Sequence, residues 1–255
     1  MRRKLNNWIP RGLGLLLAIP AFAQNPRIVY DRPATVTLQQ LSHHVPARAS
    51  KEFAAGMKAS ANHKQEDAIL HLKKAISFDP EYLTALNNLG VIYLRSDQND
   101  LAIGEFQRAI AVDPGAADVY LNLAIAYLVQ HEYKDSERVV RQVLHLDPTC
   151  ERAMVMLGIS LTIQNKFTDE AESNLRRAAQ DFPVARVWLG VGLVAKGNLG
   201  AAREQVTAYL QSGDKDEETV QKASDLLRRI ERAAQTKQAG LQAGSAVNAG
   251  PGSNY

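Results

Sequence analysis

Residues 83–116 read LTALNNLGVIYLRSDQNDLAIGEFQRAIAVDPGA, and this stretch decides the fold. Its apolar residues recur at intervals of three and four on both sides of a polar turn, which predicts two amphipathic helices. Its proline, Pro114, has counterparts 34 residues before and after it, at Pro80 and Pro148. Because proline cannot continue a helix and biases the preceding residue away from helical geometry, each of these prolines marks a turn between units. The sequence therefore predicts helical hairpins repeated along the chain.

The residue types between the prolines repeat as well. We number the places of a unit from Leu83 as place 1, so that Pro114 is place 32. Small residues at places 8, 20 and 27 let helices approach closely, and larger residues at places 7, 11 and 24 fill the space between them. Places 7, 8, 11, 20, 24 and 27 hold Leu89, Gly90, Tyr93, Ala102, Phe106 and Ala109. One hairpin alone would leave an apolar face in water, so at least about three must stack.

Further units lie on both sides of this one. A unit without the tyrosine precedes it, and the unit that follows has Ser136 in place of the small alanine. The fourth unit has one extra residue in its turn near Thr168, and the fifth is the most degenerate. Over residues 49–211 this pattern resembles the tetratricopeptide repeat (TPR), a helix-turn-helix family. The resemblance implies an all-α fold, a right-handed α-solenoid of four to five TPR units with a C-terminal capping helix.

Residues 1–23 have the layout of a secretory signal peptide. A positively charged start is followed by an apolar stretch of roughly 12 residues, well short of the ~20 that span a bilayer. The stretch ends in Pro-Ala-Phe-Ala, which predicts cleavage between Ala23 and Gln24 and a periplasmic or secreted protein. An uncleaved anchor is the alternative. Two adjacent arginines near the start faintly resemble a twin-arginine signal, but the layout favours the general secretory route.

The remaining segments are distinguished by composition. Residues 24–48 contain three prolines and no helical periodicity, which predicts an exposed linker. In residues 212–236, acidic side chains crowd the start and arginines the end of an apolar pattern, which predicts a capping helix on the last repeat. Residues 237–255 are poor in large apolar side chains, and we expect a disordered tail.

Composition and charge limit the chemistry. One cysteine among 255 residues excludes an internal disulfide and a cysteine-rich zinc site. The formal charge of +3 comes from four basic residues in the first 23; without them, 26 basic residues face 27 acidic ones. A near-neutral chain has no general electrostatic reason to bind nucleic acid or an anionic membrane surface.

No catalytic or cofactor-binding pattern emerges from the sequence. The adjacent pair His43 and His44 lacks the further ligands that a metal site requires. Cys150 lies apart from any histidine, and we interpret it as a passive small residue, with pairing to another chain as the alternative. We therefore expect no enzyme activity, no cofactor, no metal and no catalytic residues.

A concave groove is the remaining candidate site. In the family that the chain resembles, places 2, 5, 6, 9, 12 and 13 of each first helix face the ligand. Carried over to this sequence, these places predict a groove of Phe53, Met57, Asn87, Asn88, Val91, Leu94, Leu121, Asn122, Ile125, Leu128, Val155, Met156, Ile159 and Trp188. Asn88 and Asn122 share place 6, where an amide pairs with both N–H and C=O of an extended peptide. Asparagine is also common there without a bound peptide, and the linker or the tail is an alternative cover for the apolar lining.

These patterns together predict a non-enzymatic scaffold of the cell envelope. Its partner would be another protein, of unknown identity, held in the concave apolar groove. We expect no nucleic acid partner and no stable membrane insertion after signal cleavage. The alternatives are a structural subunit of an envelope assembly that uses its outer surface or ends, and an enzyme with an unrecognised site.

Overall fold

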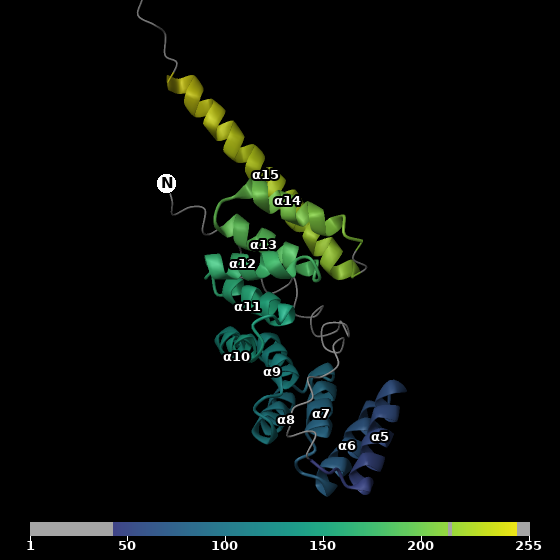
Figure 1. Cartoon of the computed structure of the whole chain (residues 1–255). Helices are drawn as coiled ribbons and strands as arrows, with labels where there is room; N and C mark the ends of the chain where they lie inside the picture. The colour runs from purple at the N-terminus through teal and green to yellow at the C-terminus, as the bar shows by residue number, and fades with distance from the viewer. Residues whose placement is uncertain (1–42, 214–215, 249–255) are drawn as a thin grey trace, which may run out of the picture.

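The structure is a computed structural model, and it describes residues 43–213 and 216–248 (Figure 1). All regular structure in these residues is α-helical. The helices in this part of the chain are α5 (Ala47–Ala61), α6 (Gln65–Phe78), α7 (Leu83–Arg95), α8 (Asn99–Val112), α9 (Ala117–Val129), α10 (Tyr133–Leu146), α11 (Glu151–Ile163), α12 (Asp169–Ala178), α13 (Val184–Ala195), α14 (Leu199–Leu210) and α15 (Glu217–Asn248). The predicted signal peptide (1–23) and most of the predicted linker (24–42) lie outside the described residues.

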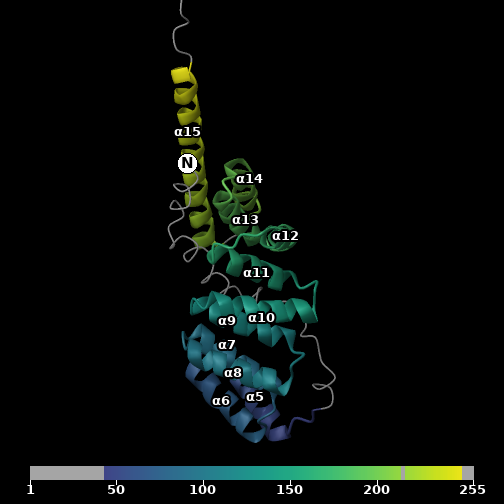
Figure 2. The same ribbon diagram turned by 90° about the vertical axis from the view of Figure 1, so that its left-hand side faces the viewer.

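The helices from α5 to α14 form five hairpins that stack in chain order (Figures 1 and 2). Each first helix packs on its own second helix, and each second helix packs on the first helix of the next hairpin. First helices also contact one another, because α9 touches α7 and α11, and α11 touches α13. Their apolar residues join in one continuous core. The prediction of an all-α solenoid is confirmed.

A left-handed residue at place 15 ends the first helix of every hairpin. The residues are His63, Asp97, His131, Asn165 and Gly197, with φ between +56° and +78°. In each hairpin the next N–H, at place 16, donates to the carbonyl at place 11, as Glu132 does to Tyr127 at 2.9 Å. This bond closes a Schellman motif, in which the left-handed residue satisfies the last carbonyls of the helix. Glycine fills this position most often elsewhere, but histidine, aspartate and asparagine tolerate it better than most residues do.

An aspartate before each proline shapes the turn between hairpins. Asp79, Asp113 and Asp147 are extended at the ends of α6, α8 and α10, as expected for a residue that precedes proline. Each carboxylate accepts a hydrogen bond from the backbone N–H two residues further on, at 2.9 to 3.2 Å. This Asx turn fixes the chain direction at each step of the stack.

Close helix approach within a hairpin depends on the pair at places 8 and 24. A Cβ added to Gly90 would lie 2.6 Å from the Phe106 ring, so only glycine fits opposite this side chain. The third hairpin has a different combination at the same places, Ala124 with Val140, and both are fully buried. Compared with the Gly90–Phe106 pair, the third hairpin thus has a larger residue on its first helix and a smaller one on its second.

The fourth hairpin has a longer turn, residues 164–168, in agreement with the extra residue expected near Thr168. The Thr168 hydroxyl accepts from the N–H of Ala171 at 3.3 Å and caps α12. The longer turn carries Phe167, whose ring lies 2.2 Å from where a Cβ on Gly192 of α13 would stand. The extra residue therefore adds a contact between the fourth and fifth hairpins.

Helix α15 caps the last hairpin, as its charge pattern predicts. Ala223, Leu226 and Ile230 are buried, and the helix contacts α14 and α13. The expectation of a disordered tail is wrong for residues 237–248, because α15 continues to Asn248 and projects beyond the stack (Figure 2). Alanine, glutamine and lysine favour helix, and no proline interrupts this part of the sequence. Together these preferences outweigh the helix-destabilising effect of its two glycines.

Candidate protein-binding groove

The predicted groove residues lie on the five first helices, α5, α7, α9, α11 and α13. The part-exposed ones are Phe53, Met57, Asn87, Asn88 and Leu94, all on α5 and α7. The buried ones are Val91, Leu121, Asn122, Ile125, Leu128, Val155, Met156, Ile159 and Trp188. Contacts between successive first helices from α7 to α13 bring the side chains on these helices into one apolar row. The accessible part of this row lies on α5 and α7.

The predicted amides already have hydrogen-bond partners within the protein. Asn122, 4% exposed, donates from Nδ2 to the Asn87 Oδ1 at 2.9 Å, which links α9 to α7. Asn88 donates from Nδ2 to the Thr84 carbonyl of its own helix at 2.7 Å. The Asn122 donor therefore links two first helices, whereas the Asn88 donor is engaged within its own helix.

An ion pair joins two first helices at the edge of the groove. Arg152 of α11 donates to an Asp118 carboxylate oxygen of α9 at 2.9 Å, and its side chain is largely buried. Both residues stand at place 2 of their units, 34 positions apart. We did not predict this pair, although opposite charges at one place of consecutive units are a readable signal for it.

Two histidine contacts lie at the N-terminal end of the solenoid, one from a residue before α5 and one within the first hairpin. His43, before α5, lies 2.8 Å from a carboxylate oxygen of Asp79 in the turn before α7. His71 of α6 lies 2.7 Å from Glu52 of α5, and this hydrogen bond lowers the pKa of Glu52. His43 thus contacts a structural carboxylate.

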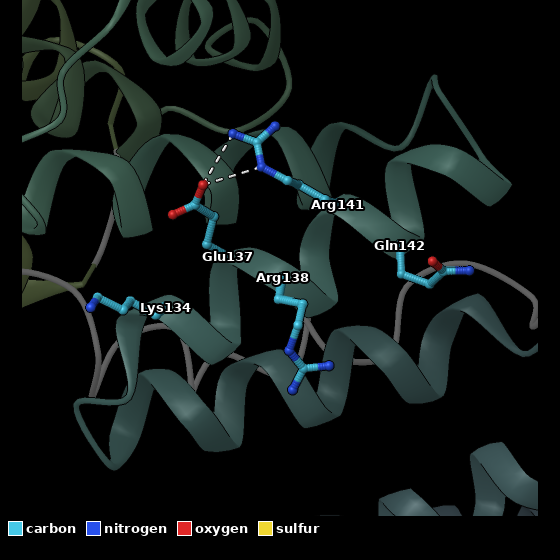
Figure 3. A pocket seen from close by; sticks show the side chains of 5 residues that line it. All are labelled: Lys134, Glu137, Arg138, Arg141 and Gln142. Atoms are coloured by element: carbon cyan, nitrogen blue, oxygen red, sulfur yellow. Dashed lines mark hydrogen bonds and ion pairs between the residues drawn. The ribbon is translucent and has the colours of Figure 1, made fainter.

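An open depression of about 410 Å³ lies on the outer face of α10 (Figure 3). It is lined by Lys134, Glu137, Arg138, Arg141 and Gln142. Figure 3 shows the guanidinium of Arg141 directed at Glu137, one turn before it on the same helix. Arg138 pairs in the same manner with Asp135 at 3.0 Å.

The charges of this depression are engaged between hairpins. Arg141 also makes two hydrogen bonds to Glu170 of α12, at 2.8 and 3.0 Å, and these lower the pKa of that carboxyl. Burial alone would raise the pKa of Glu137, but hydrogen bonds from Gln164 and Arg141 outweigh it and lower the value. The depression is therefore the surface of an ion-pair network that links the third and fourth hairpins, rather than a free anion site.

Reactive groups are scattered in the described part of the chain. Across residues 43–213 and 216–248, no three His, Cys, Asp or Glu side chains gather as a metal site would require. Ser136 and Ser160 are fully buried, and their hydroxyls contact each other at 3.3 Å between α10 and α11. Cys150 is buried at the start of α11. The part-exposed apolar side chains at the predicted groove places are Phe53, Met57 and Leu94, on α5 and α7.

Models of the tetratricopeptide repeat family match residues 62–97, 97–157 and 163–217. The chain belongs to the tetratricopeptide repeat family. No curated protein sequence matches it significantly. Within residues 43–213 and 216–248, no helix has both the length and the hydropathy to cross a bilayer.

Solved structures with the same fold include MamA, PilW and YrrB. MamA from Desulfovibrio magneticus RS-1 is 16% identical with a TM-score of 0.62, covering 68% of this chain and 99% of its own. PilW, a widely conserved type IV pilus biogenesis factor, is 20% identical with a TM-score of 0.60, covering 77% and 95%. YrrB, a TPR protein with an unusual peptide-binding site, is 18% identical with a TM-score of 0.57, covering 68% and 90%. At these identities the similarity shows the fold alone.

Proposed function

We propose that this protein is a non-enzymatic scaffold of the cell envelope that binds a segment of another protein on the surface of its first helices. One observation carries the proposal: Phe53, Met57 and Leu94, on the first helices α5 and α7, are part-exposed apolar side chains at places that face the ligand in this family. Burial of an apolar partner segment on such a row is favourable by roughly 25 cal/mol per Å² of apolar surface removed from water.

Binding would begin at the accessible end of the row. Phe53 and Met57 on α5 and Leu94 on α7 are part-exposed apolar side chains, and Asn88 on α7 is a part-exposed amide. An amphipathic helix or an extended segment would cover this end first. The peptide-binding site named for YrrB supports the use of a TPR fold in this manner.

The cellular site of action is part of the proposal. The signal-peptide layout of residues 1–23 supports export to the periplasm or beyond. The near-neutral charge of the remaining chain supports a protein partner rather than nucleic acid or an anionic membrane.

A pair of leucine variants tests the groove. Leu94→Glu adds a charge at the accessible end of the row, and Leu101→Glu adds the same charge on α8, where Leu101 is 51% exposed. Ile125 is a poorer choice because it is 2% exposed, and a charge buried there without a partner costs several kcal/mol of folding stability. Both variants are first checked for helicity by circular dichroism.

The readout is affinity capture from an envelope extract with the full chain as bait. We expect one protein to be retained by the parent and by Leu101→Glu, and lost with Leu94→Glu. Retention by Leu94→Glu would contradict binding on the first helices.

A second function uses the outer surface. The second helices carry large exposed apolar residues, namely Leu70, Phe78, Leu101 and Leu146. These side chains favour a structural subunit that packs into an assembly through its outer face. The role in pilus biogenesis named for PilW is compatible with such a subunit. The reverse capture pattern, a partner lost only with Leu101→Glu, would support this function.

A further inference from the structure

Two lysines on the first helix lack an ion-pair partner in the described part of the chain. Lys51 and Lys58 of α5 are exposed, and neither ammonium group makes a hydrogen bond or an ion pair with another described residue. Several arginines of the second helices, by contrast, each pair with a carboxylate. These are Arg108, Arg138, Arg141 and Arg176. The arginines thus have their counter-charges within the protein, whereas the two lysines of α5 do not.

The acidic side chain of the same helix is directed away from these lysines. Glu52 is the one acidic residue of α5, and its carboxylate lies 2.7 Å from Nδ1 of His71 on α6. Helix α5 carries three basic side chains, and α7 carries no acidic one. The second helices beside them, α6 and α8, together carry four acidic and three basic side chains. The excess of positive charge at this end of the stack therefore lies on the first helices.

The two lysines border the accessible part of the groove. Ala54, exposed at the ligand-facing place 6, follows Lys51 by three residues and precedes Lys58 by four. Side chains at these spacings are neighbours on a helix surface. Phe53 and Met57, the part-exposed apolar residues of α5, are four residues apart and lie directly before Ala54 and Lys58 in the sequence. An apolar strip and a strip with two cations therefore run side by side along α5.

The repeat explains why these lysines are open to a partner. They stand at places 3 and 10, which in later hairpins face the second helix of the preceding hairpin, as the contact of Ser160 at place 10 with Ser136 of α10 shows. The residues at place 3 of the later first helices are no more than 2% exposed. They are Ala85, Val119, Ala153 and Ala185. No hairpin precedes α5 among the described residues, so its places 3 and 10 are exposed and charged.

We propose that the partner segment of this protein is acidic, with carboxylates that pair with Lys51 and Lys58 while its apolar side chains cover Phe53 and Met57. This inference rests on the proposed function and names the chemistry of its partner. The two lysines are seven residues apart in α5, which separates their Cα atoms by about 10 Å along the helix axis. Acidic residues seven apart on a helix, or three apart on an extended segment, match this distance.

A pair of peptides and a pair of variants test the proposal. The probes are labelled amphipathic helical peptides of about 18 residues with the same leucine face. They differ only in the residues that border this face, which are glutamates in the acidic peptide and lysines in the basic peptide. The test variant of the full chain is Lys51→Glu with Lys58→Glu. The matched control, Lys134→Glu with Lys237→Glu, makes the same change of charge at exposed lysines of α10 and α15.

A neutral variant, Lys51→Gln with Lys58→Gln, keeps the proposal testable if the charge reversal disturbs α5. Helicity of all variants is checked by circular dichroism, and fluorescence anisotropy gives the dissociation constants. We expect the neutral variant to bind the acidic peptide about 3- to 30-fold more weakly than the parent does, since two exposed ion pairs are lost. The test variant should prefer the basic peptide, and the control should bind like the parent.

Three results would overturn the proposal. The first is a parent that does not bind the acidic peptide or binds both peptides equally, because the lysines would then serve only as a polar end of the stack. The second is an equal loss of acidic-peptide binding in the test and control variants, because net charge alone would then decide. The third is self-association of the parent, seen by light scattering, that the test variant abolishes, because the lysines would then meet a second copy of this chain.

The result is separable from the proposed function. If the test variant still captures the protein that Leu94→Glu loses, the first helices bind a partner and the acidic-partner inference fails. If the test variant reverses the peptide preference while Leu94→Glu retains the captured protein, the lysines recognise acidic segments and the proposed function fails.

Discussion

A methyl group added to Gly158 would collide with Leu175. The added Cβ would lie 2.4 Å from Cγ and 2.7 Å from Cδ2 of this fully buried leucine, across the interface of α11 and α12. Overpacking of this kind costs about 1–3 kcal/mol. Alanine is also the better helix former by about 0.8–1.0 kcal/mol, which offsets part of the cost. We therefore expect Gly158→Ala to lower the free energy of unfolding by about 0–2 kcal/mol.

A matched glycine isolates the collision. Gly104 lies inside α8, and a Cβ there would meet nothing within 4 Å. Gly104→Ala gains helix propensity without a steric collision, so the two variants should differ by about 1–3 kcal/mol in unfolding free energy. Urea denaturation followed by circular dichroism measures the difference. If Gly158→Ala is as stable as Gly104→Ala, the packing argument for place 8 is wrong.

A double variant reproduces the combination of the third hairpin. Leu175→Val makes room for a methyl on residue 158, as Val140 does for Ala124. We expect Gly158→Ala to cost less in the Leu175→Val background than in the parent. An equal cost in both backgrounds would show that the collision lies elsewhere.

Two further predictions concern the turns and the ion pairs. Gly197→Ala should lower the free energy of unfolding by about 1–2 kcal/mol because Gly197 is left-handed, with a φ of +78°, while an added Cβ would meet no other atom. Gly200→Ala, in the next helix, is the control and should not destabilise the protein. Thermal unfolding compares the two variants. For the outer network, Arg141 lowers the pKa of Glu170, so its stabilisation is present above the carboxyl's ordinary value near 4.5 and is lost as pH falls through the lowered value. Glu170→Gln should therefore lower the stability at pH 7 by no more than about 1 kcal/mol, since the ion pair is exposed. The difference in unfolding midpoint between this variant and the parent should vanish at low pH. An unchanged difference at pH 2 would contradict this prediction.

The helical repeat was predictable because it rests on local and periodic signals. Pro80, Pro114 and Pro148 mark the hairpin junctions, and the extra residue near Thr168 is the insertion seen between α11 and α12. The sequence predicts a small residue at place 8 packed against a large one at place 24. Gly90 and Phe106 show the reason, because a Cβ on Gly90 would collide with the Phe106 ring. Such pairs recur at fixed spacing, so the sequence pattern predicts which residues pack against each other.

Several features of the groove were beyond the sequence patterns. Asn122 was predicted to face a peptide, but its donor meets Asn87, because the angle between neighbouring first helices decides which amides touch. The ion pair of Asp118 with Arg152, by contrast, had a readable signal, because opposite charges stand at place 2 of consecutive units. Periodicity also says where apolar side chains lie without saying what covers them, so the burial of Ile125 was not foreseen.

The end of the chain shows the limit of reading composition. Residues 237–248 are poor in large apolar side chains, which predicts disorder, yet α15 continues to Asn248 because alanine, glutamine and lysine favour helix.

Site-specific photo-crosslinking in intact cells tests the central claim most directly. A photoreactive amino acid is placed at position 94 on the row of first helices and, in a second strain, at position 101 on the outer face of α8. The account predicts a discrete adduct with one partner protein from position 94 and none from position 101. An adduct formed only from position 101 would contradict it and assign binding to the outer surface.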